Sequence, residues 1–533
     1  MDMRIAAALS VLAVSACITA APSQVEAITA PISYEAEGLI AGPMTGVIDA
    51  LARGDITSVQ LTQTYLDRIA AIDVSGPRLQ AVIALNPDAL AQAAASDMRR
   101  ARAEILGPLD GVPVLLKDNI ETLDPMPTTA GSLALRNNIT GRDSPLVAGL
   151  RAQGAVILGK TNLSEWANFR SNFSMSGWSG IGGQTRNPHM LDRNPCGSSS
   201  GTGAAIAASL AAAGVGTETN GSIICPSNVN GLVGFKPTVG LVPQTHIVPI
   251  SPSQDTAGPM TLSVADAALM MNAMVAGEED FSRYLSTDAL HGVRIGVLRD
   301  AQGSNPDILA KLEQALEVMR QLGATLIDIK GQATPPGFWA DSLLVLEYEF
   351  KASLNAYLAE AAPGVEVRSL SDLITFNNRN ADTELALFGQ DLLESSDAKG
   401  PLTEEAYLTA LSDIQRATRE EGIDRLLAEF GADVLVAPSG PIAPRIDSVN
   451  GDTWPDWAGA GYLAAVAGYP HLTVPMGEVH GIPLGVSFMG ARGDDARLLG
   501  YGHAYEVATR LRPAPKYLPS AEDRPEISAA LSR

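Results

Sequence analysis

Cysteine is scarce in this sequence, which has only three in 533 residues. Three cysteines are too few for a disulfide framework, and none has the spacing of a zinc site. Cys17 lies in the N-terminal segment, which leaves Cys196 and Cys225 in the body of the chain. These two could pair in an oxidising compartment, but free cysteine is commonly buried as a small apolar side chain. We therefore expect Cys196 and Cys225 to be buried and unpaired.

Positive charge is also in short supply. The chain has 37 Lys and Arg residues against 59 Asp and Glu residues, which gives a formal net charge of −22. A surface this acidic repels phosphate backbones, so we expect no nucleic acid partner. The charge does not identify a substrate, because net charge bears on solubility more than on chemistry.

Motifs typical of several enzyme classes are missing. The six histidines form no H-x-x-x-H or H-E-x-x-H pattern, so nothing calls for a metal or another cofactor. The absence of G-x-S-x-G disfavours an α/β-hydrolase triad. GAVILGKT at 154–161 matches the P-loop pattern, but its AVIL residues read as a strand, where a P-loop needs a phosphate-wrapping loop. We therefore do not predict nucleotide binding.

No apolar run is long enough to span a membrane. The N-terminal run, residues 5–16, follows an arginine and is shorter than the about 20 residues that a spanning helix needs. Small residues come next, so residues 1–27 are predicted to be a secretory signal peptide, cleaved after Ala21 or Ala27. VSAC at 14–17 also resembles a bacterial lipobox, which would make Cys17 a lipidated first residue. We expect export to the periplasm or the medium, with a lipid anchor at Cys17 as one alternative.

What the chain has in plenty is apolar residues, at 46% with only 18% charged, which is typical of a globular protein. GVRIGVL at 292–298 predicts a strand, leucines at helical spacing over 309–322 predict a helix, and 325–329 predicts a second strand. This pattern indicates an α/β protein with a mixed or parallel sheet flanked by helices.

The rest of the chain fits one interlocked domain over 28–515. Residues 340–430 are predicted to be mainly helical and peripheral or substrate-facing. Strands are predicted again at 434–437, 471–475 and 486–489, and they would complete the same sheet. Residues 516–533 are predicted to be a C-terminal tail over the surface.

Small residues gather between Pro195 and Ser222, in PCGSSSGTGAAIAASLAAAGVGTETNGS. Serines at 198–200 stand among glycines, and Gly221 precedes Ser222 in a second turn. Glycine lets backbone N–H groups approach a substrate, and a serine hydroxyl can attack or relay a proton. We expect a strand-free crossing, a buried helix, to return one turn beside the other. A GSSSG segment alone is more often an ordinary loop.

Lys117 follows Val114-Leu115-Leu116, a short apolar run typical of a buried strand. A lysine there is either a surface residue whose stem covers apolar neighbours or a desolvated functional amine. The second reading suits a serine hydrolase, because serine needs a base and lysine is one only when neutral. Burial favours the neutral amine by lowering its pKa.

Several motifs together resemble the amidase signature family, in order over residues 40 to 510. They are GVPVLLKDNI (111–120), GKTNLSEWAN (159–168), GSSSG (197–201), GTETNGSIICPS (216–227), GFKPTVG (234–240), AVAGYPHLTVPMG (465–477), GIPLGVSFMG (481–490) and DDARLLGYGHAYEVAT (494–509). The segment from 221 to 243 and SQDTAGPM at 253–260 look most similar to the bacterial peptide amidases.

The resemblance implies a single large α/β domain whose mixed twisted sheet is covered by helices on both faces. It also implies a Ser–cisSer–Lys triad in which Ser222 is the nucleophile, Ser198 the middle serine and Lys117 the base. The cis peptide bond would join Gly197 to Ser198, and Ser199 would support the loop. The backbone N–H groups of the oxyanion hole would be those of Thr219, Asn220, Gly221 and Ser222.

We therefore expect an amidase without metal or cofactor that hydrolyses the C-terminal amide of peptides to the free acid and ammonia. The alternatives within the family are fatty-acid, aryl and other small amides. A glutamyl-tRNA amidotransferase subunit is disfavoured by the expected export and by the acidic charge. The alternative from another class is a non-catalytic amide-binding protein of the same fold. The oligomeric state does not follow from the sequence.

Overall fold

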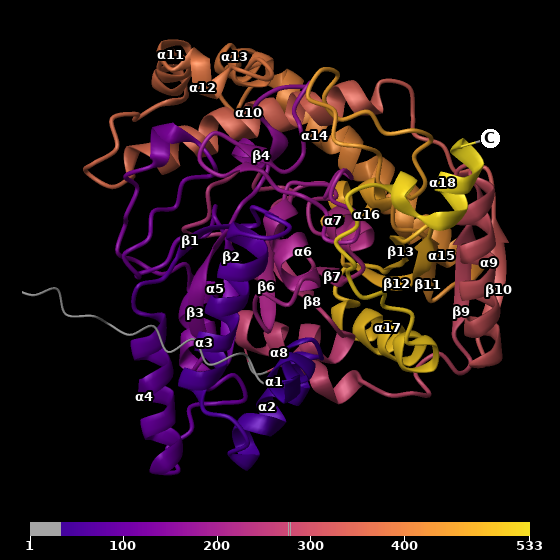
Figure 1. Ribbon diagram of the computed structural model, residues 1–533. Helices are drawn as coiled ribbons and strands as arrows, with labels where there is room; N and C mark the ends of the chain where they lie inside the picture. The colour runs from indigo at the N-terminus through magenta and orange to yellow at the C-terminus, as the bar shows by residue number, and fades with distance from the viewer. Residues whose placement is uncertain (1–33, 276, 278, 533) are drawn as a thin grey trace, which may run out of the picture.

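The structure is a computed structural model of the chain and describes residues 34–275, 277 and 279–532. At its centre lies one eleven-stranded mixed sheet in the order β1-β3-β2-β6-β8-β7-β12-β13-β11-β9-β10 (Figure 1). The strands of this sheet are β1 (Val82–Leu85), β2 (Pro113–Lys117), β3 (Val156–Thr161), β6 (Ala213–Glu218), β7 (Val233–Lys236), β8 (Thr256–Thr261), β9 (Arg294–Leu298), β10 (Thr325–Ile329), β11 (Val434–Pro438), β12 (His471–Val479) and β13 (Ile482–Met489). A separate small ribbon pairs β4 (Trp178–Ser179) with β5 (Gly183–Gln184).

Parallel and antiparallel pairs alternate along the sheet in blocks. The strands β3, β2 and β6 are parallel to one another, and so are β11, β9 and β10 near the opposite end. Antiparallel pairs through β8, β7, β12 and β13 join the two blocks. The predicted mixed α/β sheet in a single large domain is therefore confirmed.

Helices cover both faces of this sheet (Figure 1). They are α1 (Tyr34–Ile40), α2 (Met44–Arg53), α3 (Ser58–Arg68), α4 (Ala89–Ala101), α5 (Pro145–Ala152), α6 (Ser200–Ala207), α7 (Ile224–Asn230), α8 (Val264–Met274), α9 (Pro306–Gln321), α10 (Phe338–Ala359), α11 (Leu370–Arg379), α12 (Ala381–Glu384), α13 (Asp391–Asp397), α14 (Glu405–Thr418), α15 (Asp424–Phe430), α16 (Gly461–Ala467), α17 (Asp495–Thr509) and α18 (Pro525–Leu531).

The strand β12 shows how the two faces are covered. Its Leu472 and Val474 lie against Gly502 of α17. Thr473, between them, is paired with Gly234 of β7, which packs against α7. Since successive strand residues point to opposite sides, α17 and α7 cover opposite faces.

The predicted strand–helix–strand unit is present as β9, α9 and β10, with the two strands parallel. Asn305 caps α9 by accepting hydrogen bonds from the backbone N–H groups of Asp307 and Ile308, and Pro306 occupies its first turn. Both features are typical of helix starts. The unit forms as predicted because its signals are local in the sequence.

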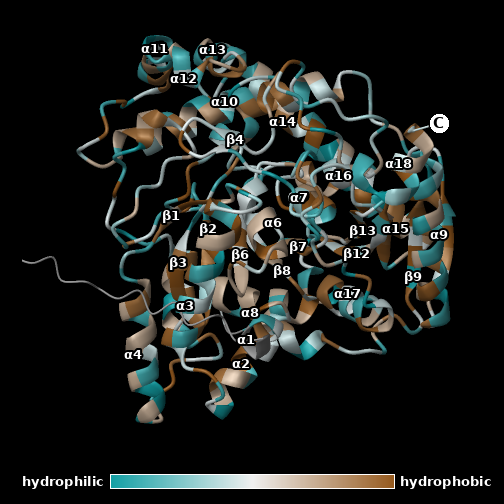
Figure 2. Cartoon of the chain, viewed as in Figure 1, coloured by the Kyte–Doolittle hydropathy of each residue, from teal (hydrophilic) through white to brown (hydrophobic). Residues whose placement is uncertain are grey.

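The sheet core is apolar, whereas polar residues are more frequent on the outer helices (Figure 2). All residues of β2 and β3 are buried, as in parallel strands that are covered on both faces. Three buried positions of the whole sheet are lysines, Lys117 in β2, Lys160 in β3 and Lys236 in β7. Burying an amine is costly unless it is paired or neutral, so each of the three needs an explanation.

The helical layer predicted for 340–430 is also present, as α10 to α14, whereas α15 packs against β9 and β10 (Figure 1). Leu354 and Leu358 of α10 belong to a buried cluster that includes Leu135 and Trp166, from loops that follow β2 and β3. The layer therefore rests on the loops at the carboxyl ends of these strands.

The structure corrects one expectation, confirms another and adds to a third. The segment between the two serine turns is not free of strands, because β6 follows α6 and is a central strand of the sheet. GKT at 159–161 belongs to β3 itself, so no phosphate-wrapping loop lies there. The C-terminal segment 516–533 includes α18, and its Ala521 is buried beside Met190 and Ile482.

The predicted signal peptide and the lipobox at Cys17 lie outside the described residues. In the part of the chain that the structure describes, no helix is both long and apolar enough to cross a membrane.

Candidate active site

Lys117 ends β2, at the edge of the sheet where the parallel strands β3, β2 and β6 have their carboxyl ends. This edge is where open α/β sheets usually place ligands. The Lys117 side chain is fully buried, and its Nζ donates to Ser198 Oγ at 2.8 Å. Nζ also lies 2.8 Å from Thr217 Oγ1 and 3.2 Å from the Thr217 carbonyl, just beyond the β6 residues that pair with β2.

The surroundings of Lys117 favour the neutral amine. Burial lowers the pKa of Lys117 from 10.5 to about 7, and the negative charges of Asp255 and Glu218 oppose this shift only in part. Neither carboxylate forms an ion pair with Lys117 in the described part of the chain, so desolvation outweighs attraction. An amine with this pKa can both accept and return a proton near neutral pH.

Ser198 is held between two turns. The peptide bond that joins it to Gly197 is cis, as the family resemblance implies, and Ser198 itself is fully buried. A side chain at position 197 would collide with Ser164 Oγ and with Asn168 Oδ1, so only glycine fits there. The carbonyl of Ser198 accepts the Ser164 N–H at 3.1 Å, which anchors the loop to the end of β3.

Ser199 and Ser200 fasten this loop. Ser199 Oγ donates to the Thr217 carbonyl at 3.0 Å and accepts the Thr217 N–H at 3.2 Å. Ser200 Oγ donates to the Cys196 carbonyl at 2.5 Å, across the first turn of α6. The predicted supporting position of Ser199 therefore agrees with its contacts, which tie the serine turn to β6.

Ser222 lies in the second turn, just before α7. Its carbonyl accepts the Ser199 N–H at 3.2 Å, so the two turns meet through the backbone. Glu218 stabilises the start of α7 by accepting the N–H groups of Ile223 at 2.8 Å and Ile224 at 3.0 Å. Within the described residues, no hydrogen bond joins the Ser222 and Ser198 hydroxyls. The structure therefore brings Lys117 and Ser198 into contact and places Ser222 in the adjoining turn.

The backbone around Ser222 offers several donors. In the described part of the chain, four successive N–H groups donate no hydrogen bond to another protein group, and they belong to Thr219, Asn220, Gly221 and Ser222. Gly221 has φ +84°, a left-handed conformation that turns the chain here. Successive unpaired N–H groups in one turn are of the kind that can stabilise an oxyanion.

Cys196 and Cys225 form a disulfide, so the prediction that they are unpaired is wrong. They lie 29 residues apart in the sequence, but the fold brings their Cα atoms to 5.9 Å. This separation lies in the ordinary range for a disulfide. The sequence alone does not place the two turns, so the bonding partner of each cysteine is visible only in the fold. The bond links the loop before Ser198 to the helix after Ser222.

The larger of two cavities beside this site has a volume of about 480 Å³. It reaches the backbone of both serine turns and extends to the helical layer. Its lining residues are Cys196, Gly197, Asn220, Gly221, Ile224, Cys225, Trp339, Ser439, Trp457, Gly459, Gly461 and Tyr462. A volume of this size suits a small organic ligand or a few residues of a peptide.

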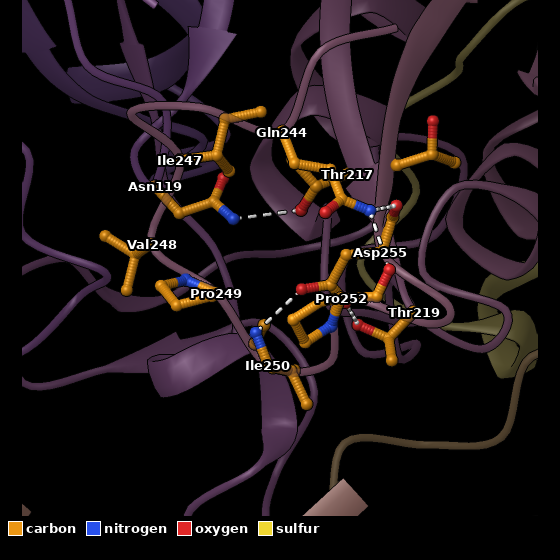
Figure 3. A pocket seen from close by; sticks show the side chains of 12 residues that line it. Asn119, Thr217, Thr219, Gln244, Ile247, Val248, Pro249, Ile250, Pro252 and Asp255 are labelled. Carbon is orange, nitrogen blue, oxygen red and sulfur yellow. Dashed lines mark hydrogen bonds between the residues drawn. The ribbon is translucent and has the colours of Figure 1, made fainter. Parts of the chain in front are cut away.

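The smaller cavity, of about 40 Å³, lies beside the Lys117 contacts (Figure 3). Asn119 Nδ2 donates to Thr217 Oγ1 at 3.0 Å, and Thr219 Oγ1 donates to Asp255 at 2.6 Å. Asn119 Oδ1 has no hydrogen-bond partner in the described part of the chain. This cavity is polar on one side and has room for only a few water-sized molecules.

Sequence reasoning missed Thr217, Asn119 and Asp255. Thr217 stands five residues before Ser222, and Asn119 stands two after Lys117, so both belong to quoted motifs. Nothing in those motifs shows that Thr217 receives the lysine. Burial raises the pKa of Asp255 to about 6, against the hydrogen bonds it accepts from Thr219 and nearby backbone.

The other titratable groups are arranged differently. Lys236, with its pKa lowered to about 8 by burial, donates to the Pro237 carbonyl at 3.1 Å. His471 is buried against Ser487, and burial lowers its pKa to about 3. Among the described residues, no group of three or more His, Cys, Asp or Glu side chains is placed to hold a metal ion.

Comparison with known proteins agrees with this geometry. The family model described as Amidase matches residues 60–499. The chain is 37% identical over 489 residues to a probable amidase of Arabidopsis thaliana, covering 87% of this chain and 89% of that protein. It is 45% identical to the native peptide amidase from Stenotrophomonas maltophilia, with a TM-score of 0.84 over 89% of this chain and 98% of that one. The structure of a peptide amidase in complex with the competitive inhibitor chymostatin gives 47% identity and a TM-score of 0.86, over 89% and 99% of the two chains. The chain belongs to the amidase signature family and is an amidase, an enzyme of carbon–nitrogen amide bonds.

Proposed function

We propose that this amidase is a serine hydrolase in which Ser222 is the nucleophile, Ser198 the relay and Lys117 the base. The observation that carries the proposal is the fully buried Lys117 amine, with its lowered pKa, at 2.8 Å from Ser198 Oγ. Burial keeps a large share of this amine neutral near pH 7, which is what a base requires. Lys160 and Lys236, the other buried lysines of the sheet, donate no hydrogen bond to a serine hydroxyl among the described residues.

In the first half of the reaction Ser222 Oγ attacks the amide carbonyl carbon. Its proton passes to Ser198 Oγ, while the Ser198 proton passes to Lys117 Nζ. The carbonyl oxygen becomes an anion and accepts hydrogen bonds from the free N–H groups of 219–222, where losing one donor costs about 10²–10³ in rate. The relay then runs backwards and protonates the amide nitrogen, the carbon–nitrogen bond breaks, and ammonia leaves an acyl-Ser222 ester.

Water completes the cycle through the same groups. It attacks the ester carbon and gives its proton to the Ser198–Lys117 relay. The returning proton goes to Ser222 Oγ as the ester bond breaks, so the acid leaves and the enzyme is restored. No metal or organic cofactor takes part in these steps, because the lysine supplies the base and the backbone supplies the oxyanion donors.

We propose the C-terminal amide of peptides as the substrate. Two features support this choice: the likeness to peptide amidases, and the pair of cavities of very different volume. The cavity of about 480 Å³ has room for the last residues of a peptide. The cavity of about 40 Å³, beside Lys117, takes ammonia or water but not a further residue. A cavity of this volume beside the Lys117 contacts suits a leaving group as small as ammonia.

We also propose that the protein is exported, with its signal peptide removed or with Cys17 lipidated. The disulfide between Cys196 and Cys225 supports this, because structural disulfides persist in oxidising compartments and are rare in the cytosol.

The function is tested by measuring ammonia released from amidated peptides, fatty-acid amides, aryl amides and free amino-acid amides. We expect the highest kcat/KM on the peptide amides, with the acid as co-product. Ser222→Ala should abolish release, and a fluorophosphonate should label Ser222 in the wild type only. Retained turnover in Ser222→Ala would refute the triad, while a preference for aryl or fatty-acid amides would refute the peptide substrate.

A further inference from the structure

Two exposed tryptophans line the larger cavity. Trp339 is 55% exposed and Trp457 is 49% exposed, although a tryptophan normally buries most of its surface. The two come from distant parts of the chain, the start of α10 and the loop before α16, yet both line the same cavity as Gly197, Asn220 and Gly221. Large apolar side chains left exposed at the mouth of a site indicate a surface that a ligand covers.

Trp339 belongs to a packed aromatic group. Its ring centroid lies 5.1 Å from that of Phe338 and 5.1 Å from that of Tyr462, the residue that follows the start of α16. The Tyr462 hydroxyl accepts a hydrogen bond from Gln332 Nε2 at 2.8 Å. These contacts hold the Trp339 ring in place without any ligand, so one wall of the cavity is already formed.

Trp457 is held from the other side. Its ring packs edge-on against Trp454, with the centroids 5.7 Å apart. Next in the chain, Ala458 is fully buried, and the Gly459 N–H donates to the Ala301 carbonyl at 2.7 Å. Contacts on both sides of Trp457 therefore hold this loop in place, and the Trp457 ring forms a second wall of the cavity.

The cavity between these walls has no charged lining. Its twelve lining residues include no Asp, Glu, Lys, Arg or His, and its two cysteines are joined in the disulfide. The acidic residue nearest in sequence to Trp457 is Asp456, whose carboxylate accepts a hydrogen bond from Ser304 Oγ at 2.6 Å. A charged substrate side chain would lose water here and gain no partner, whereas an aromatic ring would gain two flat apolar surfaces.

We propose that Trp339, Tyr462 and Trp457 form a specificity subsite for an aromatic or large aliphatic side chain in the last two residues of an amidated peptide. The inference rests on the proposed function, because the cavity reaches the serine turns that hold the amide. It goes further by stating which peptide amides the enzyme selects and by assigning the selection to three side chains.

The test is a panel of blocked dipeptide amides in which each of the two positions is varied through Gly, Leu, Phe, Lys and Asp. We expect kcat/KM of the wild type to be at least about tenfold higher for Phe than for Gly at the selected position, with Lys and Asp lowest. Most of the difference should lie in KM, because the side chain is bound in substrate and transition state alike.

Trp457→Ala and Trp339→Ala should each lower the Phe-to-Gly ratio several-fold, and Trp457→Phe should retain most of it. Tyr284→Ala is the matched control, because Tyr284 is 48% exposed and does not line the cavity. Thermal unfolding of each variant shows that it is folded.

An unchanged Phe-to-Gly ratio in folded tryptophan variants would overturn the subsite, as would a wild-type preference for Lys or Asp. In both cases release of ammonia from the Gly peptide by the wild type would leave the proposed function standing. If the wild type released ammonia from no peptide amide, the proposed function itself would fail, and the subsite with it.

Discussion

Lys117 and Lys160 lie on neighbouring strands and are equally buried, but their surroundings suit different roles. Lys160 of β3 is paired with Leu116 of β2, the residue before Lys117. Because strand side chains alternate, Lys160 and Lys117 point to opposite faces of the sheet. Lys160 Nζ donates to the Ile120 carbonyl at 2.6 Å and to Thr128 Oγ1 at 2.8 Å, and it lies 3.7 Å from Asp118. Lys117 meets hydroxyls and one carbonyl, but no carboxylate at ion-pair distance in the described residues.

The partners, rather than the degree of burial, therefore distinguish the two. Burial lowers the pKa of both amines. In Lys160 the close carboxylate of Asp118 supports the charged form, and the amine ties together the loop that follows β2. In Lys117 the acceptors are neutral hydroxyls that can themselves exchange a proton. A buried lysine indicates a base only where no carboxylate holds its charge in place.

The largest expected effect separates the two lysines by activity. Lys117→Met should lower kcat/KM by roughly 10³-fold or more, because the serine relay loses its base. Ammonia release from an amidated peptide measures the effect, and circular dichroism shows that the variant is folded. A folded Lys117→Met protein with near wild-type turnover would remove the distinction between the two sites.

The second effect separates them by stability. Lys160→Met should lower the free energy of unfolding by about 3–5 kcal/mol, because it leaves the buried Asp118 carboxylate without its partner. Urea unfolding measures the loss, and adding Asp118→Asn to Lys160→Met should recover much of it. If the double variant did not recover stability, the loss in Lys160→Met would not come from the unpaired Asp118 carboxylate.

In the same unfolding experiment, Lys117→Met should change the free energy of unfolding in the opposite direction. We expect the free energy of unfolding at pH 7 to rise by roughly 1–3 kcal/mol, because the cost of burying the amine exceeds the hydrogen bonds that are lost. Stability of the wild type should increase as pH rises from about 7 toward 10.5, since the unfolded chain binds the extra proton in that window. In the variant this part of the increase should vanish, and its persistence would contradict a lowered pKa of Lys117.

The pH profile of turnover sharpens the comparison further. Below a pH of about 7 Lys117 is protonated and cannot accept a proton, so kcat/KM should rise with pH through that value and then level off. Because Asp255 supports the charged amine, Asp255→Asn should move the midpoint to lower pH. A profile that is flat from pH 5 to 9 would argue against lysine as the base.

The smallest effect concerns the hydroxyl beside Lys117. Thr217→Val removes one acceptor of the amine while keeping the shape of the side chain. We expect kcat to fall by about tenfold, with KM nearly unchanged, because Thr217 Oγ1 accepts a hydrogen bond from Lys117 Nζ and so positions the base. Thr217→Ser should restore most of the activity, whereas equal losses in both variants would indicate a packing defect.

The sequence predicts well what depends on local pattern. The strand–helix–strand unit of β9, α9 and β10 was readable because apolar spacing and a proline-started helix lie within one stretch. The strand β6 could not be predicted in this way, because its sequence AGVGTE has few of the β-branched and aromatic residues typical of strands. It is a strand because the sheet provides partners on both sides, β2 and β8.

The candidate site likewise has one part that local motifs predict and another part that only the fold shows. Lys117, Ser198 and Ser222 were found through motifs, and the fold places them in one region, although their catalytic roles stay a prediction. Thr217 and the pairing of Cys196 with Cys225 depend on how distant turns meet in three dimensions. No spacing in the sequence carries that information, so both appear only with the structure.

The disulfide between Cys196 and Cys225 has one further consequence, which concerns proteolysis. By joining Cys196 to Cys225 it makes residues 196–225 a closed covalent ring, and this ring contains both Ser198 and Ser222. A protease that cuts the ring once opens the polypeptide but does not separate its two parts. The nicked enzyme therefore runs as one full-length band on a gel until it is reduced, and both serine turns stay attached to the same molecule.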